Sequence, residues 1–446
     1  MSNLTGAMHQ HLWRALAAFL LLVVLLQYFL LFSTSDGAGE VPRRPPHHLP
    51  SPIEHNSAET WTFDHLRDAD NPALNRAKCQ AAFPELYYEI DRSVQYWRDR
   101  SHTITQEDTE ISWRQDAALR VLVHGNQVRI LETRHTWEGE GYRKRTRAVL
   151  GQIHRALLGA AAAGESAPTA EFAVTVDDQT LIPNAEDDTH TIWAFSRRLI
   201  DGDQERHWLI PDFNFWSSPP VAGAFHEMRD RARVYDAHVV EKKQQVIWRG
   251  VKWTNEYVRG SLLNVTEGMP WADVEEVDWE NKSTIMRVED MCRYMFVAHT
   301  EGRSWSGRLK YLLNCDSLPI IHSLDWTAHF YHLLTPSGAD QNYIPVERDF
   351  SDLAEKVEWY MAHPRESQRV VDNAVATFRT RYTTPAAEAC YWRRLLNGWS
   401  EVAFVPDPYE TTTAIMNGTT VEQRRLRGIA FEEFVQLQGN YPQVAG

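Results

Sequence analysis

The chain has 446 residues, of which 43% are hydrophobic and 11% aromatic, and this composition excludes an intrinsically disordered protein. Its formal net charge of −14 argues against nucleic acid as a partner, because surfaces that bind nucleic acid are basic. The length exceeds what one hydrophobic core usually fills, which predicts two globular lobes. Any anionic ligand must therefore be bound by a local cluster of basic side chains.

The first predicted element is a transmembrane helix over residues 15–32, an apolar run interrupted only by Gln27 and Tyr28. A helix of this length spans roughly 27 Å, close to the thickness of an early secretory membrane. Arg14 directly precedes the run and predicts a cytosolic tail, 1–14, with the rest of the chain in the lumen. The alternative is a cleaved signal peptide, whose apolar region is usually shorter.

The segment after this helix, residues 33–59, is rich in Pro, Gly, Ser and His, which predicts an extended stem. We expect the lobes at 60–205 and 206–385, a helix returning to the body at 386–405, and a less regular tail at 406–446. A lumenal location agrees with three glycosylation sequons, at Asn264, Asn281 and Asn417. It also favours disulfides among the four cysteines, for which three full pairings are possible: Cys79, Cys292, Cys315 and Cys390.

Short apolar runs alternate with helical patterns in the later chain, which is typical of a parallel α/β sheet. The predicted strands are 172–176, 245–248, 294–298 and 318–322. The predicted helices that follow are 350–361, 364–378 and 385–399. We therefore expect an α/β protein with two Rossmann-like lobes. Its ligands should lie at the carboxyl ends of the strands.

The first predicted strand end carries two adjacent carboxylates, Asp177 and Asp178. A carboxylate at this place can act as a general base that deprotonates a hydroxyl group. The alternative is an aspartate that only caps a turn. The two residues are adjacent, so they do not form the DxD pattern of a metal site.

The second strand ends in Arg249 and Gly250. A guanidinium group suits bidentate contact with phosphate, and glycine permits close approach of a ligand to the backbone. An arginine paired with a carboxylate between the lobes is an equally good interpretation.

The third strand end is followed by a permissive loop with two arginines and the start of a predicted helix. Backbone N–H groups at a helix start, together with arginine, bind anions, which predicts a diphosphate site. An ordinary capped helix is the alternative. The residues of this site are Arg303, Ser304, Trp305, Ser306, Gly307 and Arg308.

Six segments occur in a recognisable order: VTVDDQ, HWLIPDFNFWSSP, WRG, GRSWSGRLKYLLNCDSLPIIH, NYIPVERDFSDL and ACYWRRLL. As a set they resemble glycosyltransferase family 90 over about residues 79–402. This family holds lumenal protein O-glucosyl- and O-xylosyltransferases and fungal capsule-associated xylosyltransferase-like proteins. The resemblance implies a GT-B-like fold, and the predicted membrane anchor and stem resemble the fungal branch.

The resemblance also implies roles for individual residues. Asp178 falls on the catalytic base, Arg249 on the arginine that meets the donor nucleotide, and residues 303–308 on the diphosphate loop. The substrate-pocket segment corresponds to Phe213, Asn214 and Trp216. The implied disulfides are Cys79–Cys390 and Cys292–Cys315. A loop that helps the protein O-glucosyltransferases hold a folded peptide domain is absent around 131–145, which favours a glycan or another acceptor.

The implied function is a Golgi-membrane, lumen-facing, inverting glycosyltransferase. It moves xylose or glucose from a UDP-sugar to a glycan or glycoprotein. No tightly bound cofactor is expected. Asp68 and Asp70 have DxD spacing, but they lie in a polar stretch with no predicted strand before it. We therefore expect no metal site and no metal requirement, although Mn²⁺ is compatible with the family. Two other classes remain open, a lumenal glycoside hydrolase and a non-catalytic carbohydrate-binding protein. The donor sugar, the acceptor and the linkage are not determined by these residues.

Overall fold

A computed structural model describes residues 61–136, 140–179, 188–219, 221–281, 284–416 and 419–437. The predicted membrane helix at 15–32, the stem at 33–59 and the sequon at Asn417 lie outside these residues. Within the described ranges, no helix combines the length and the apolar character that crossing a membrane requires.

The first main sheet has six strands in the order β17-β2-β1-β3-β4-β6. Its strands are β1 (Ala118–His124), β2 (Gln127–Arg134), β3 (Ala170–Thr175), β4 (Trp193–Ala194), β6 (Trp208–Leu209) and β17 (Ile429–Ala430). The pairs β17–β2, β2–β1 and β1–β3 are antiparallel, whereas β3–β4 and β4–β6 are parallel. The first lobe, which we expected to be Rossmann-like, therefore has a mixed sheet.

The antiparallel part of this sheet begins with a tight hairpin between β1 and β2. Its two turn residues, Gly125 and Asn126, have φ values of 56° and 59°. Two consecutive residues in the left-handed region suit the right-handed twist of a two-residue hairpin. This Gly-Asn pair is the sequence signal for a hairpin that the analysis of apolar runs missed.

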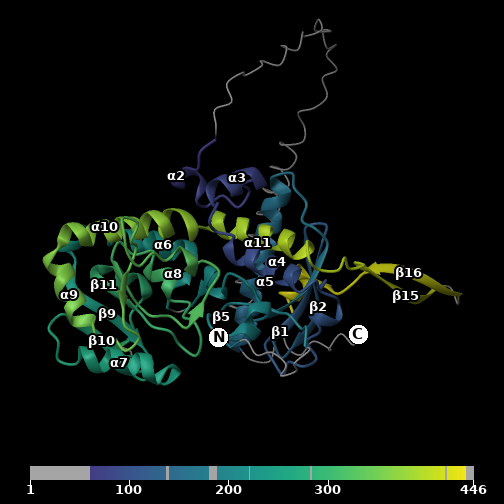
Figure 1. Cartoon of the computed structure of the whole chain (residues 1–446). Coiled ribbons are helices and arrows are strands. Elements are labelled where there is room, and N and C mark those ends of the chain that lie inside the picture. Colours follow the sequence, from purple (N-terminus) through teal and green to yellow (C-terminus); the bar gives the residue numbers. More distant parts are fainter. Residues whose placement is uncertain are drawn as a thin grey trace, which may run out of the picture. The chain divides into compact units, whose positions relative to one another are not determined.

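The second main sheet is parallel throughout, in the order β10-β9-β11-β12-β14. Its strands are β9 (Lys243–Gly250), β10 (Ala272–Glu276), β11 (Tyr294–His299), β12 (Leu318–His322) and β14 (Ile344–Val346). Figure 1 shows the helices α7 (Glu256–Thr266), α9 (Leu353–Ala362) and α10 (Pro364–Ala374) around it. The molecule thus has a mixed α/β fold with two main sheets, and all four predicted strands are present.

The other helices pack mainly in the first lobe and in the region between the two sheets. They are α2 (His65–Asp68), α3 (Arg76–Ala82), α4 (Tyr88–Asp99), α5 (Glu140–Ala162), α6 (Phe225–Arg233), α8 (Leu309–Leu312), α11 (Pro385–Ser400) and α12 (Phe431–Phe434). Thr384 caps α11, since its side chain accepts a hydrogen bond from the backbone N–H of Ala387. From there α11 packs against α3, α4 and α5. The disulfide Cys79–Cys390 joins α3 to α11, and Cys292–Cys315 lies in the second lobe, as the resemblance implied.

The tail after 405 is more regular than we expected. It contains the hairpin of β15 (Tyr409–Met416) and β16 (Thr419–Leu426), and then β17, which pairs with β2 at the edge of the first sheet. The first sheet also includes β6, which lies beyond the lobe boundary that we predicted at 205/206. That boundary stays a prediction.

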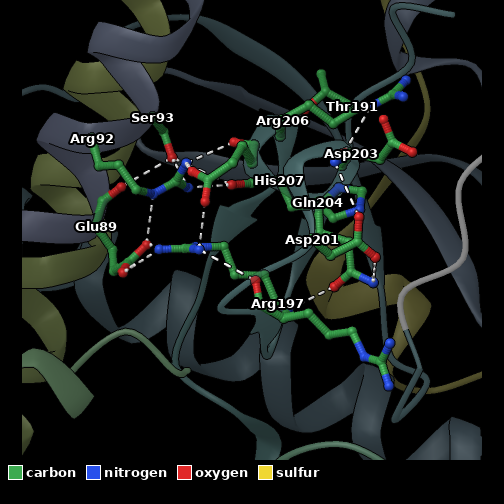
Figure 2. Close-up of polar contacts among 12 residues, drawn as sticks. Glu89, Arg92, Ser93, Thr191, Arg197, Asp201, Asp203, Gln204, Arg206 and His207 are labelled. Atoms are coloured by element: carbon green, nitrogen blue, oxygen red, sulfur yellow. Dashed lines mark hydrogen bonds and ion pairs between the residues drawn. The ribbon is translucent and has the colours of Figure 1, made fainter. Parts of the chain in front are cut away.

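A short ladder connects the regions of the two sheets, because β5 (Arg197–Arg198) pairs with β13 (Trp326–Thr327). Figure 2 shows how Arg197 is held in place: its guanidinium donates to Glu89 of α4. In the same network Arg92 binds Glu89 at 2.8 Å and donates to the backbone oxygen of His207 at 2.7 Å. The remaining short ladder is β7 (Ser217–Ser218) with β8 (Gly223–Ala224).

Candidate functional site

Asp178 lies three residues beyond the end of β3, and its side chain is 39% exposed. Its Oδ1 is 2.9 Å from Nη1 of Arg145 on α5. The neighbouring Asp177 is turned differently: its carboxylate accepts a hydrogen bond from the N–H of Asp178 and lies 3.7 Å from Arg114. Asp178 is thus the more exposed of the two carboxylates.

The loop after β11 meets this strand end directly. The hydroxyl of Ser304 donates a hydrogen bond of 2.5 Å to the backbone oxygen of Asp178. Ser304 itself is fully buried. The predicted base and the predicted phosphate loop, which are 126 positions apart in the chain, therefore lie together.

The helix expected after this loop is only one turn long, since α8 covers Leu309–Leu312. A helix this short has little macrodipole, and the expected contribution of a helix N-terminus to anion binding stays a prediction. Trp305 is buried and packs against Phe195, with ring centroids 5.3 Å apart. Arg303 is exposed and lies over the ring of Trp253 at 5.0 Å.

The cationic character of the site comes instead from Arg308 and Arg259. Arg308 makes no ion pair with any described residue, and burial lowers its pKa to about 10. Arg259, on α7, donates to the backbone oxygens of Glu301 and Val251. Burial and, secondarily, the charge of Arg308 lower the pKa of Arg259 to about 9. Neither guanidinium group has a carboxylate partner among the described residues, and unpaired guanidinium groups suit an anionic ligand.

Arg249 has other partners in the structure. Its guanidinium pairs with Asp273, lies 3.4 Å from Glu275, and donates to the backbone oxygen of Trp248. Both carboxylates belong to the adjacent strand β10. Contact between Arg249 and a donor nucleotide stays a prediction, and it would require Arg249 to exchange these partners. At Gly250 an added Cβ would lie 2.6 Å from the ring of Trp248, so this glycine is needed for packing.

The aromatic segment is joined to the loop by a buried ion pair. Nζ of Lys310 lies 2.7 Å from both carboxylate oxygens of Asp212. The side chain of Asn214 packs closely against Gly307, since a Cβ added at Gly307 would lie 2.3 Å from the side-chain nitrogen of Asn214. Phe213 and Asn214 belong to a short 3-10 helix, Phe213–Phe215, that Asp212 caps.

Beside this segment is a cavity of about 340 Å³, which we call the α5 cavity. Its lining residues are Gly141, Lys144, Arg145, Arg147, Ala148, Phe213, Trp216, Ser217, Ser218 and Pro219. Arg145 therefore contacts Asp178 and lines the cavity as well. The 213–216 segment predicted to form a substrate pocket contributes two aromatic rings to it.

Three residues of this region were missed by the sequence analysis: Arg145, Arg259 and Lys310. Two of them carried a detectable signal. Arg259 lies three residues before Leu262 on the buried face of a helix, and Lys310 is flanked by apolar residues in a buried run. A basic residue on an apolar helix face is unusual enough to be singled out. Arg145 had no such signal, because its place depends on packing.

The remaining predicted sites are placed as follows. No group of three His, Cys, Asp or Glu side chains suited to a metal ion occurs among the residues that the structure covers. Asn264 is exposed on α7, although Thr266 of the same sequon is buried. Asn281 is exposed at the edge of a gap in the described residues.

Comparisons with known proteins agree with the resemblance. The family model described as "Glycosyl transferase family 90" matches residues 77–433. Protein O-glucosyltransferase 1 of Bos taurus is 24% identical over 256 residues, which covers 52% of this chain and 63% of that protein. Protein O-glucosyltransferase 3 of Rattus norvegicus is 30% identical over 120 residues, 27% of this chain and 23% of that protein.

A third similar protein is the O-glucosyltransferase rumi homolog of Aedes aegypti, 23% identical over 218 residues, 44% of this chain and 52% of that protein. The chain thus spans less than two thirds of the length of these curated relatives. Together with the two disulfides, the similarity points to the secretory pathway.

Proposed function

Because the chain belongs to glycosyl transferase family 90, we propose that it is a UDP-sugar-dependent, inverting glycosyltransferase of the GT-B type. It moves xylose or glucose to a hydroxyl group of a glycan or glycoprotein acceptor. The similarity to protein O-glucosyltransferases supports this reaction class. These relatives match only part of the chain, so we infer the acceptor from the residues of the site.

One observation carries the proposal, namely the hydrogen bond from Ser304 to the backbone of Asp178. It puts a partly exposed carboxylate next to a loop that ends in Arg308. An enzyme that transfers a sugar from a nucleotide needs such a pair of features: a base for the acceptor and positive charge for the leaving diphosphate.

In the proposed reaction, Asp178 takes the proton of the acceptor hydroxyl. The acceptor oxygen then attacks the anomeric carbon of the donor from the side opposite UDP. A new C–O bond forms as the bond between the anomeric carbon and the β-phosphate oxygen breaks, and UDP departs with the bonding electrons.

Negative charge grows on the departing diphosphate, where Arg308 and Arg259 stabilise it. Their guanidinium groups have no carboxylate to neutralise them among the described residues, so their charge is available to the ligand. This scheme requires no metal ion and is compatible with Mn²⁺. Arg249, Gly250 and the rest of the 303–308 loop complete the proposed donor site.

We place the enzyme in the Golgi membrane, held by the predicted single helix at 15–32, with its catalytic part in the lumen. Asn264, Asn281 and Asn417 are the proposed glycosylation sites. The disulfides and the family support the secretory route.

The proposal is tested by UDP titration and by one matched pair of variants. UDP should raise the melting temperature of the purified protein, and a panel of UDP-sugars should show hydrolysis of one donor. Asp178→Asn should reduce transfer by about 10²–10⁴-fold and leave the UDP-induced shift unchanged.

Asp177→Asn makes the same chemical change in the adjacent carboxylate and should retain most of the activity. Full turnover in Asp178→Asn would refute the assignment of the base. A folded protein that UDP does not stabilise would instead favour a carbohydrate-binding protein or a hydrolase.

A further inference from the structure

Among the described residues, the α5 cavity is lined by three basic side chains, Lys144, Arg145 and Arg147, and by no carboxylate. In a chain with a net charge of −14, three basic side chains around one cavity are a local concentration of cations. The volume of about 340 Å³ lies within the range of roughly 300–1,000 Å³ that is usual for small-ligand sites.

The contacts of Lys144 and Arg145 leave both able to bind a ligand, whereas Arg147 donates to the backbone oxygen of Val435 at 3.1 Å. Lys144 pairs with Glu140 at 2.5 Å one helical turn away, but both side chains are largely exposed, so a bound anion can replace this contact at little cost. Arg145 uses Nη1 both for Asp178 and for the backbone oxygen of Val176. Its planar guanidinium has further N–H donors for a second carboxylate.

The other wall of the cavity is aromatic. Arg145 lies over the ring of Phe213 at 4.5 Å. Trp216 is 39% exposed, and its ring is supported by Gly151, where an added Cβ would be 3.2 Å away, and by Arg155 at 4.9 Å. Aromatic faces pack against the C–H surfaces of sugar rings, and the cations beside them suit a carboxylate.

We infer that the acceptor is an acidic glycan, and that the α5 cavity binds a uronic acid residue of it. The uronate carboxylate contacts Lys144 and Arg145, and its ring packs on Trp216. Because Arg145 also contacts Asp178, a sugar in the cavity presents a neighbouring hydroxyl group to the base. This inference rests on the proposed function, because only a glycosyltransferase would use the bound glycan as an acceptor.

The test compares two disaccharide acceptors that differ only in ending in glucose or in glucuronic acid. With UDP-xylose or UDP-glucose as donor, the KM of the glucuronic acid acceptor should be at least about tenfold lower, and it should rise with ionic strength. Lys144→Gln should reduce this preference by about threefold to tenfold, and Lys144→Arg should restore it.

Lys356→Gln is the matched control, because Lys356 of α9 also lies near an acidic residue four positions earlier, Asp352 at 3.9 Å. It should leave the preference unchanged. Equal KM values for the two acceptors, or a lower KM for the neutral one, would overturn the inference.

A binding measurement separates this inference from the proposed function. Calorimetry should show a glucuronic acid oligosaccharide binding to the protein, with weaker binding in Lys144→Gln. If UDP neither binds nor is released from any donor, the proposed function fails. Calorimetry with the oligosaccharide then still shows whether the cavity binds a uronate. An acidic peptide of equal charge that binds as tightly as the oligosaccharide would overturn the assignment to a glycan.

Discussion

Lys310 forms a fully buried ion pair with Asp212, with Nζ 2.7 Å from each carboxylate oxygen. Lys310 also donates to the backbone oxygen of Gly307 at 2.8 Å, and Asp212 accepts from the N–H of Asn214. The pair thus holds the 303–308 loop against the aromatic segment. Burial lowers the pKa of Lys310, and the charge of Asp212 partly offsets this.

Asp212→Asn should destabilise the protein strongly, because it leaves the charge of Lys310 buried without a counter-ion. We expect the free energy of unfolding to fall by about 3–5 kcal/mol, measured by urea denaturation. The control is Glu366→Gln, which breaks an exposed pair with Arg369 and should cost less than about 1 kcal/mol. Similar losses in the two variants would show that the buried pair has no special role.

Gly307→Ala should disturb the loop through a steric clash. The added Cβ would lie 2.3 Å from the side-chain nitrogen of Asn214 and 3.4 Å from Oδ1 of Asp212, and Lys310 holds Asp212 in place. We expect a loss of about 1–3 kcal/mol in stability and weaker UDP binding. Gly202→Ala is the control, since nothing lies within 4 Å of its added Cβ. Unchanged UDP affinity in Gly307→Ala would separate the loop from the donor site.

Arg308→Met should have opposite effects on stability and on binding. The side chain carries a charge whose pKa burial lowers to about 10, so replacing it with an apolar group should keep or raise the melting temperature of the free protein. The increase in melting temperature caused by UDP should largely disappear. The control is Arg365→Met at an exposed arginine, which should alter neither the melting temperature of the free protein nor the UDP-induced shift. A full UDP-induced shift in Arg308→Met would remove Arg308 from the proposed donor site.

His322 should make the folded state sensitive to acid. Its Nε2 accepts from the N–H of Glu301 at 3.0 Å, and its Nδ1 donates to the backbone oxygen of Ser323 at 2.8 Å. Only the neutral ring has a nitrogen that can accept, so this arrangement requires neutral His322. Burial lowers the pKa of His322 to about 4, against an ordinary value of 6.5. Between these two pH values the unfolded chain therefore binds more protons than the folded one.

The contribution of His322 is present above pH 6.5 and is lost as the pH falls towards 4. Urea denaturation at a series of pH values should show this decline in the free energy of unfolding. His322→Gln should reduce the slope of the free energy of unfolding against pH, by an amount that corresponds to at most about one bound proton. A slope identical to that of the wild type would contradict the assignment, and His65→Gln, at an exposed histidine of α2, provides the comparison.

The sequence by itself predicted the family and three of the five strands of the second sheet, β9, β11 and β12. These three contain short apolar runs, because a strand that is buried on both faces needs apolar residues on both. The ordered segments from Asp178 to α11 were sufficient to indicate the family. The mixed first sheet was not predicted, because the Gly-Asn hairpin signal between β1 and β2 was missed. Its strands β4, β6 and β17 have only two residues each and carry no periodicity of their own.

Only the tertiary structure decided which basic residues face the candidate site. Arg249 and Arg308 looked equivalent in the sequence, as arginines after or near strand ends. Arg249 is paired because the register of β9 with β10 places it opposite Glu275 and next to Asp273. Arg308 has no such neighbour among the described residues, and helices elsewhere in the chain contribute Arg259 and Arg145 to the region. Whether a guanidinium is neutralised depends on charges brought close by folding, and this information is not local in the sequence.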